Sequence, residues 1–374
     1  MRGNVTKAKP GVTKSATMYD VAKLAGVSHQ TVSRLLLGYE GIRPETREKV
    51  LGAIRELDYR TNVSARNLRT GRTGMISLAI PSLNQPYFAE LAQSVMSAAL
   101  DKGLTVFVET TDGVRERELE VVSGQRRNLV DGVIWIPDRL ANEDIGELGI
   151  DFPLVLVGDR VLHSQFDHVT FPNFGGARAA VEHLISLGRR RIAVIGVEEA
   201  NDFGASTPRL AGYQAALADA GIPLDPDLLV YEGAWVRKSG FDAAERLLAS
   251  KIDFDAIFCF NDALALGALR VLLAAGIRVP DDVAVVGFDN IQDAFYSTPS
   301  LTTISPGRDE IASAAVEMLS NRLNGTAGNG GPADIVPNFE LIVRESTVGL
   351  GRPFGGLQAA ARDVEQAAPR SDEP

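Results

Sequence analysis

Several kinds of residue and segment are scarce in this chain, and their scarcity excludes whole classes of protein. The 374 residues contain one cysteine, Cys259, so no disulfide can form within the chain. No apolar run is long enough to cross a membrane, and no apolar segment follows the basic N-terminus to make a secretory signal. A metal-binding spacing is absent among the four histidines, which are His29, His163, His168 and His183. We therefore expect a cytoplasmic protein with no membrane contact and no cofactor.

Motifs of common enzyme classes are also absent. The chain has no G-x-x-x-x-G-K-[ST] phosphate-binding loop and no G-x-S-x-G nucleophile elbow. Residues 349–374 are rich in Ala, Gly, Pro and charge, and they contain no leucine heptads. The sequence therefore predicts a protein that is not an enzyme, with a disordered tail that forms no coiled coil.

The composition that remains is that of a globular protein with unevenly distributed charge. Hydrophobic residues make up 45% of the chain and charged residues 23%, which is typical of chains that bury large cores. Residues 1–72 carry 14 Lys and Arg against 6 Asp and Glu, whereas the remainder carries 24 against 42. A basic head on an acidic body indicates that only the head meets phosphate, although a solvated basic tail would show the same balance.

Two short helices joined by a glycine are predicted after a disordered arm at residues 1–16. Thr17 can cap the first helix, Gly26 can end it, and Ser28 can cap the second. The buried side of the second helix would consist of Val32, Leu35 and Leu36. The other side would be compact and polar, with His29, Gln30, Thr31, Ser33 and Arg34. This pattern predicts a helix-turn-helix, whose second helix lies in the DNA major groove.

A third helix and a linker complete the predicted head. The third helix begins at Pro44, and the helical domain would span residues 17–60. Residues 61–73 are polar and basic, with Ala65 and Leu68 as their apolar points. Such a segment is too short for a stable isolated helix, but it could fold against DNA or a second copy. Leu68 is either an ordinary surface leucine or an apolar wedge for the minor groove.

From residue 74 onward, Val- and Ile-rich strands alternate with amphipathic helices. Near-continuous apolar strands separated by helices indicate parallel sheets that are covered on both faces. The pattern restarts near residue 170, with five to six strand–helix units on either side. We therefore expect two similar α/β subdomains in the body.

The motifs and their order resemble those of the lac repressor and purine repressor family of bacterial transcription regulators. The resemblance covers about residues 16–348. The motifs are Y-D-V-A-x-x-A-G-V-S-x-x-T-V-S-R at 19–34, T-R-E-K-V at 46–50, A-R-N-L at 65–68, R-L-A-G-Y at 209–213, N-D-A-L-A-L-G-A at 261–268, V-G-F-D-N at 286–290 and P-S-L-T-T-I at 299–304.

This resemblance implies an N-terminal all-α helix-turn-helix domain followed by an α/β periplasmic-binding-protein-like body of two doubly wound parallel-sheet subdomains. The chain would cross between the subdomains three times. The implied body is residues 74–348, with subdomain one at about 74–169 and 303–332 and subdomain two at about 170–302 and 333–348.

By the same resemblance, the second helix reads DNA bases through His29, Gln30 and Arg34. Gln can pair with adenine and Arg with guanine, each discriminating by about 1–3 kcal/mol. Phosphate contacts fix the position of the protein on DNA but do not read its sequence. They are expected from Tyr19, Ser28, Thr31 and Asn62. Ala65 and Leu68 belong to the family's hinge, which would enter the minor groove at the centre of a palindromic operator bound by a homodimer. Thr61 departs from the family here, because many members have Pro at that position.

The resemblance also implies a ligand cleft between the subdomains, at the carboxyl ends of parallel strands. Its residues would be Tyr87, Phe88 and Asp159 from subdomain one, and Arg209, Trp235, Asn261 and Asp289 from subdomain two. Carboxylate, amide and guanidinium groups can bind paired hydroxyls, and an indole can stack on a sugar ring. Taken singly, each residue could instead be a turn carboxylate, a capping asparagine or a core aromatic.

The predicted function is a sequence-specific DNA-binding repressor whose operator affinity is controlled by a small molecule. A sugar is preferred over a purine, because Phe203 and Ala205 stand where purine-binding members carry a further Arg and Thr. The alternatives are a purine- or nucleoside-responsive regulator of the same family, a sugar-binding protein without a regulatory role, and a body that only dimerises. The missing leucine heptads favour a dimer over a tetramer.

Overall fold

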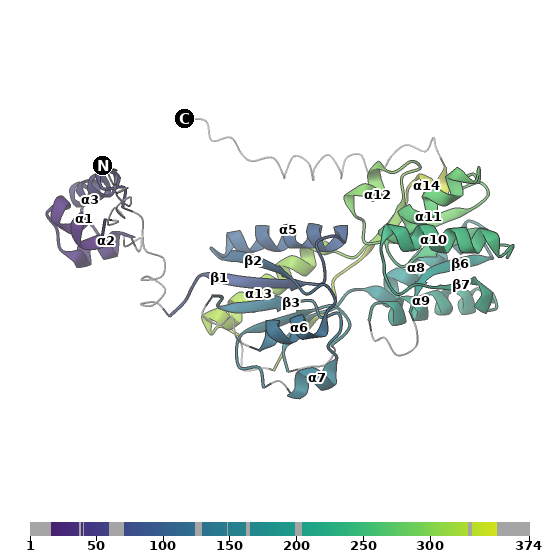
Figure 1. Cartoon of the computed structure of the whole chain (residues 1–374), viewed down its shortest axis with the longest axis horizontal. Helices are drawn as coiled ribbons and strands as arrows, with labels where there is room; N and C mark the ends of the chain where they lie inside the picture. Colours follow the sequence, from purple (N-terminus) through teal and green to yellow (C-terminus); the bar gives the residue numbers. More distant parts are fainter. Residues whose placement is uncertain are drawn as a thin grey trace, which may run out of the picture. The chain divides into compact units, whose positions relative to one another are not determined.

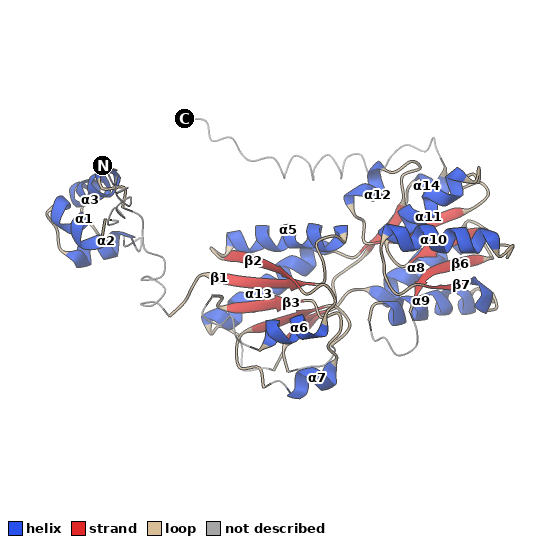
Figure 2. Ribbon diagram, viewed as in Figure 1, coloured by secondary structure: helices blue, strands red, loops and turns tan. Residues whose placement is uncertain are grey.

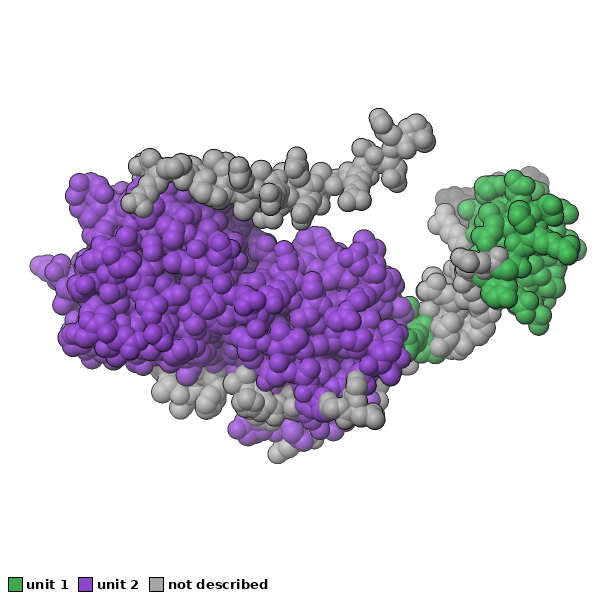
Figure 3. Space-filling view, turned by 180° about the vertical axis from the view of Figure 1, so that it is seen from behind, with its two compact units in different colours: residues 1–73 green, residues 74–374 purple. Residues whose placement is uncertain are grey.

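The computed structural model of the chain describes most of two compact units, which are residues 1–73 and 74–374 (Figure 3). The described residues are 16–36, 39, 41–59, 71–123, 129–147, 149–161, 165–198, 204–327 and 331–349. Three sets of sequence predictions lie outside these residues. They are the arm up to residue 15, the hinge residues Asn62, Ala65 and Leu68, and the tail from residue 350.

The first unit contains three described helices, α1 (Met18–Ala25), α2 (His29–Leu36) and α3 (Pro44–Glu56). Thr17 and Asp20 form a reciprocal capping box at the start of α1, which satisfies two backbone N–H groups that the helix itself cannot. Gly26 ends α1 with a positive φ of 65°, a conformation that costs glycine little. Val21, Val32 and Val50 are fully buried at the centre of the three helices. The predicted helix-turn-helix is confirmed.

Ser33 lies elsewhere than the sequence indicates. It was expected on the polar face of α2, but only 7% of it is exposed. Ser33 lies three residues before Leu36, so the two side chains share one side of the helix. Because serine is small, it fits at the edge of the core, and the exposed part of α2 is correspondingly narrower.

The second unit contains two six-stranded sheets (Figures 1 and 2). We name the first sheet and its helices the first lobe, and the second sheet and its helices the second lobe. The first sheet has the order β11-β5-β4-β3-β1-β2, and all its pairs are parallel. Its strands are β1 (Met75–Ile80), β2 (Thr105–Thr110), β3 (Gly132–Trp135), β4 (Leu154–Val157), β5 (Asp167–Val169) and β11 (Asp334–Ile335).

Helices cover both faces of the first sheet, as its buried strands predict. The apolar residues of the strands alternate between two clusters. One cluster packs against α5 (Pro86–Asp101) and α13 (Arg308–Asn324), and the other against α6 (Arg115–Val122) and α7 (Asn142–Glu147). Within the described residues, no helix is both long and apolar enough to span a bilayer.

The second sheet has the order β12-β10-β9-β8-β6-β7, and only β12 runs antiparallel to its neighbour. Its strands are β6 (Ile192–Val197), β7 (Leu229–Tyr231), β8 (Ala256–Cys259), β9 (Ala284–Phe288), β10 (Thr302–Ser305) and β12 (Glu340–Ile342). Its helices are α8 (Asn173–Ser186), α9 (Ser206–Asp219), the 3₁₀ turn η1 (Pro226–Leu228), α10 (Arg237–Ala249), α11 (Asp262–Ala274), α12 (Gln292–Tyr296) and α14 (Glu345–Val348). The expected α/β body of two largely parallel subdomains is confirmed.

The chain passes between the two sheets three times: after β5, after β10 and after β11. The strand pairing assigns Thr302–Ser305 to the second sheet and Asp334–Ile335 to the first, whereas the sequence indicates crossings near residues 302 and 332. Both strands are only two to four residues long, too short for a periodic pattern to mark where they end.

Candidate functional sites

The exposed face of α2 combines free side chains with side chains that already have partners. Gln30 and Arg34 are exposed, and the guanidinium of Arg34 lies 5.7 Å from the ring centroid of Tyr39. The half-buried His29 ring stacks on Tyr19 of α1, with centroids 4.7 Å apart. The long hydrogen-bonding side chains of Gln30 and Arg34 thus lie on the surface, where such side chains can bond a base edge. Sequence reasoning did not single out Tyr39, because an isolated aromatic in a loop carries no pattern.

The hydroxyls at the start of α2 have a structural role. Ser28 Oγ accepts a hydrogen bond from the backbone N–H of Thr31 at 3.1 Å and lies 2.9 Å from Thr31 Oγ1. This cap fixes the first turn of α2. Backbone N–H groups at a helix N-terminus favour negative charge, so this end of α2 is chemically suited to a phosphate.

A cavity of about 380 Å³ opens between the two lobes of the second unit. Phe88, Asp159 and Trp235 line it, together with charged residues of its rim. The volume lies within the usual range of small-molecule sites. The rim carboxylates and guanidiniums are Asp112, Asp138, Arg139, Arg160 and Glu198.

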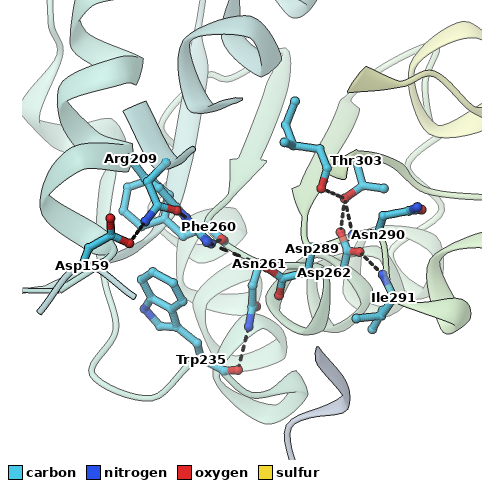
Figure 4. A network of polar contacts seen from close by, with 12 residues as sticks. Asp159, Arg209, Trp235, Phe260, Asn261, Asp262, Asp289, Asn290, Ile291 and Thr303 are labelled. Carbon is cyan, nitrogen blue, oxygen red and sulfur yellow. Dashed lines mark hydrogen bonds and ion pairs between the residues drawn. The ribbon is translucent and has the colours of Figure 1, made fainter. Parts of the chain in front are cut away.

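Arg209 of α9 lies at the centre of a polar network beside this cavity (Figure 4). Only 5% of it is exposed, and it donates hydrogen bonds to the carbonyl of Phe260 and, at 2.7 Å, to Asn173 Oδ1. Its guanidinium lies 5.1 Å from the Trp235 ring centroid and 3.8 Å from Asp289. Burial lowers the pKa of Arg209. The network holds the cation over the ring of Phe288, at 3.7 Å from its centroid, and near the ring of Trp235, where electrostatic attraction to the ring faces is favourable.

Asp289 follows β9 directly and is the least satisfied carboxylate of the network. It is 7% exposed and has a φ of 116°, an uncommon conformation for a residue other than glycine. Among the described residues its carboxylate has only the ion pair with Arg209 and accepts no hydrogen bond. Burial raises the pKa of Asp289 to about 7, against the opposing effect of Arg209. A buried acceptor without a donor is costly.

Asp159 follows β4 and faces Arg209 from the first lobe. Burial raises the pKa of its carboxyl to about 7, although Arg209 and a hydrogen bond from the Asn173 amide act in the opposite direction. Asn173 is 1% exposed, and it joins Asp159 of one lobe to Arg209 of the other. Sequence reasoning missed Asn173 as a site residue. The signal was available, because Asn173 follows β5 as Asn261 follows β8.

Tyr87 of α5 has a buried hydroxyl without a partner. It is 8% exposed, and no described residue bonds its Oη. Its ring packs edge-on against Phe88 and Phe171, with centroids 5.7 and 5.8 Å away. Burial, followed by the nearby charge of Asp289, raises its pKa well above the usual value. Of the predicted site residues, Phe88, Asp159 and Trp235 line the cavity. The others lie beside it, and among them are an unused hydroxyl and an unused carboxylate, those of Tyr87 and Asp289.

Asn261 serves as a cap and a support in this structure. Its Oδ1 accepts from the backbone N–H of Leu264 at 2.8 Å, which caps α11, and its amide donates to the Trp235 carbonyl at 3.0 Å. The Trp235 indole N–H donates to the carbonyl of Gly196 at 3.0 Å. The ring is therefore fixed, and its face rather than its N–H is left for a ligand.

Asp262 is a second site residue that sequence reasoning missed. It is fully buried, and it accepts hydrogen bonds from Thr303 Oγ1 at 2.6 Å and from the backbone N–H of Ile291 at 3.0 Å (Figure 4). Burial raises its pKa well above the usual value. A Cβ at Gly287 would collide with its carboxylate. Asp262 thus supports the backbone that presents Asp289, and no local pattern distinguishes it from an exposed helix-start aspartate.

Comparison with known proteins gives two family matches and several relatives along nearly the whole chain. Residues 17–62 match the bacterial regulatory proteins of the lacI family, and residues 181–347 match the periplasmic binding protein-like domain. The regulator CelR of Thermobifida fusca is 36% identical over 88% of this chain and 98% of its own length. The repressor PurR of Erwinia tasmaniensis is 34% identical over 88% and 96%.

Solved structures agree with these relatives. A CelR–cellobiose complex is 34% identical, with a TM-score of 0.64, over 88% of this chain and 99% of its own. A lac repressor dimer bound to operator and the anti-inducer ONPF is 29% identical, with a TM-score of 0.77, over 89% and 99%. The names of these relatives are those of transcriptional regulators and not of enzymes.

Proposed function

The chain belongs to the lacI family of bacterial regulatory proteins, and we propose that it represses transcription as a homodimer that responds to a sugar. It is a helix-turn-helix transcriptional regulator with a periplasmic-binding-protein-like body, as its relatives are. Its partners in this proposal are a palindromic operator in double-stranded DNA, a second copy of the chain and a small effector. The proposed location is the cytoplasm, at the nucleoid.

The observation that carries the effector proposal is a pair of unused polar groups in the network around Arg209, beside the residues that line the cavity. The Asp289 carboxylate accepts no hydrogen bond and the Tyr87 hydroxyl has no partner, within the described residues, although both are more than 90% buried. Neighbouring hydroxyls on a sugar can donate hydrogen bonds to the Asp289 carboxylate and can form a hydrogen bond with the Tyr87 hydroxyl. One face of Trp235 lies over Arg209, and the indole also lines the cavity, where it offers an apolar surface for a sugar ring.

The charge of the cavity lining favours an uncharged ligand. Asp112, Asp138, Asp159 and Glu198 line it against only two cations, Arg139 and Arg160. A phosphorylated sugar or a nucleotide would add negative charge to a site that already has an excess of it. A neutral saccharide agrees with the cellobiose complex of the relative CelR. A neutral purine base is the second candidate, because the PurR relatives are nearly as similar to this chain.

The test is thermal unfolding of the full-length protein with cellobiose, other neutral saccharides, and adenine, guanine and hypoxanthine. A ligand that binds only the folded state at a hundred times its Kd stabilises it by about 2.7 kcal/mol. We expect a saccharide to raise the Tm of the wild type and to leave Asp289→Ala unchanged. Asp281→Ala, an exposed aspartate of the same lobe, is the control and should respond as the wild type does. Stabilisation by a purine and by no saccharide would refute the sugar proposal.

The DNA-binding roles are proposed residue by residue. His29, Gln30 and Arg34 read bases, while Tyr19, Ser28 and Thr31 contact phosphates. The exposed positions of Gln30 and Arg34 and the cap at Ser28 support these roles. For Asn62, Ala65 and Leu68 the proposal rests on the sequence motif. We propose that the chain divides at about residues 17, 61, 74 and 170, with the two later crossings between the lobes after Ser305 and after Ile335.

The proposed control of DNA binding is a shift between two arrangements of the lobes. A ligand can favour one arrangement only by the difference in its affinity for the two. Asp159 and Phe88 belong to the first lobe and Asp289 and Trp235 to the second, so a ligand that contacts both sets distinguishes closed from open lobes. In a dimer, such a change would alter the spacing of the two heads.

A further inference from the structure

Glu118 of α6 is a buried carboxylate that takes no part in the cleft itself. It is 0% exposed, and its bonds are to three consecutive backbone N–H groups. Its Oε1 accepts from Asp138 at 2.7 Å, its Oε2 accepts from Leu140 at 2.8 Å, and Arg139 lies 3.1 Å from each oxygen. The three backbone N–H groups of the turn at residues 138–140 thus all point to the carboxylate of Glu118.

A carboxylate is the side chain that this arrangement requires. Successive backbone N–H groups that point to one place form an anion-binding concavity. Burial raises the pKa of Glu118, while the bonds from Leu140, Asp138 and Arg139 act in the opposite direction. A glutamine would offer one acceptor oxygen where the turn needs two, and its amide hydrogens would oppose the backbone donors.

The turn that Glu118 holds forms part of the cavity rim. Asp138 and Arg139 both line the cavity, as do Asp112 and Gly113 of the adjacent turn. The guanidinium of Arg139 donates from Nε to the Gly113 carbonyl at 3.1 Å. A Cβ at Gly113 would lie 2.7 Å from Asp138 Oδ2, so the two turns fit closely. A change in the path of residues 138–140 would therefore move both charged side chains at the mouth of the cleft.

We propose that Glu118 is a positioning residue for effector specificity, which holds Asp138 and Arg139 where they contact the outer part of the ligand. This rests on the proposed function, namely that the cleft binds a saccharide. Asp159 and Trp235, which line the cavity, would hold the first sugar ring together with Asp289 of the adjoining network. The Glu118-anchored rim would then select what is attached to that ring, so its effect should be larger for a disaccharide than for a monosaccharide.

The first test is amide hydrogen exchange of the full-length protein without ligand, comparing wild type, Glu118→Gln and the control Glu116→Gln. Glu116 lies on the same helix but is exposed. We expect the amides of residues 138–140 to exchange at least about tenfold faster in Glu118→Gln only, because their acceptor is lost. Amides of β1 and β3 should keep their protection. Unchanged exchange at 138–140, or faster exchange throughout β1–β4, would overturn the positioning role.

The second test is calorimetric titration of the same proteins with cellobiose and with glucose. We expect Glu118→Gln to lose about tenfold in affinity for cellobiose and much less for glucose, while Glu116→Gln changes neither. An equal loss for both sugars would indicate a merely structural role and refute the specificity proposal. If neither these sugars nor any other saccharide of the thermal unfolding test binds the wild type while the turn loses protection, the saccharide proposal fails and the positioning of the turn stands.

Discussion

At the scale of the residue, two carboxyl groups of the cleft have similar and unusual properties. Burial raises the pKa values of Asp159 and Asp289 to about 7 each. They lie on opposite lobes with Arg209 between them, so above about pH 7, where both are ionised, one buried cation opposes two buried anions. This imbalance is unfavourable in the free protein. It is the kind of strain that a binding site retains because a ligand can relieve it.

A prediction follows for the stability of the free protein. The pKa of Asp289 is about 7 in the folded state against a usual 3.8, so the folded state binds more protons between these values. Stability therefore falls as pH rises from about 4 to 7 and stays low above 7. Asp289→Asn removes this effect. At about 1.4 kcal/mol per pKa unit, we expect it to raise the free energy of unfolding at pH 8 by up to about 4 kcal/mol.

Urea unfolding of wild type and Asp289→Asn at pH 8 and pH 4.5 measures this difference. The gain should be largest at pH 8 and should fall to about 1 kcal/mol at pH 4.5, where the wild-type carboxyl is protonated in the folded state but already mostly ionised in the unfolded state. Asp281→Asn, at an exposed aspartate, should show no gain at either pH. An equal gain at both pH values would mean that the effect does not come from the carboxylate charge.

At the scale of the element, α2 combines a fixed N-terminal turn with free side chains farther along. The cap between Ser28 and Thr31 fixes where the helix starts, and the apolar face seats it on α1 and α3. Gln30 and Arg34 then project from a rigid support. Because the backbone that carries these side chains is already fixed, only their rotamers are ordered on binding, and less of the hydrogen-bond energy is spent on ordering.

We predict that Gln30→Ala and Arg34→Ala each weaken binding to the preferred operator by about 1–3 kcal/mol and relax the preference at one base position per half-site. Tyr19→Phe is the matched control for a phosphate contact and should weaken binding to all sequences alike. Selection from a randomised DNA library, followed by affinity measurements at fixed salt, gives both quantities. Uniform weakening by Gln30→Ala would assign Gln30 to the backbone instead.

The elements differ in how far the sequence could predict them, and the reasons are physical. Side-chain caps begin α1 and α2, a glycine ends α1, and Pro44 begins α3. Each of the three helices also has an apolar side, so local rules are sufficient. Short strands such as β5, β7, β11 and β12 are two or three residues long and owe their pairing to the neighbouring chain. Ser33 was misplaced because a helix face does not show where a small polar residue becomes buried.

Whether a site residue could be predicted from the sequence also depends on whether its role is set by nearby or by distant residues. Trp235, Asn261 and Asp289 adjoin strand ends or stand in family motifs, so their positions could be proposed from the sequence. Glu118 and Asp262 could not, because each is defined by backbone groups far away in the chain, at residues 138–140 and 291. A buried carboxylate and a solvated one look alike in a sequence. Only the folded chain shows which N–H groups converge on it.

At the scale of the whole molecule, a contact between the lobes accompanies the cleft. Glu90 of α5 accepts a hydrogen bond from the backbone N–H of Gln292 at 2.8 Å and pairs with Arg308 at the start of α13. Gln292 begins α12 in the second lobe, three residues after Asp289. Opening the lobes would therefore break the hydrogen bond between Glu90 and Gln292 and would move Asp289 at the same time. If a ligand favours the closed lobes, as we propose, lobe closure must raise the affinity for the ligand by the same factor.

The surface of the first lobe indicates how two copies could associate. Leu100 and Met96 on α5 are 75% and 44% exposed, and Phe107 on the edge strand β2 is 46% exposed. A group of large apolar side chains on adjoining elements is typical of an interface. A dimer would present two heads to one palindrome. Because the second head then binds in an intramolecular step, the dimer gains affinity by orders of magnitude over a single head.

We therefore predict that Leu100→Glu converts a dimer to a monomer, because it would bury a carboxylate without a partner in the interface. Leu224→Glu, at an exposed leucine of the second lobe, is the control and should leave the dimer intact. Sedimentation of the full-length proteins at micromolar concentration measures the association. Operator affinity of Leu100→Glu should fall at least about a hundredfold, while saccharide binding persists, since the cleft lies within one chain. A dimer that survives Leu100→Glu would place the interface elsewhere.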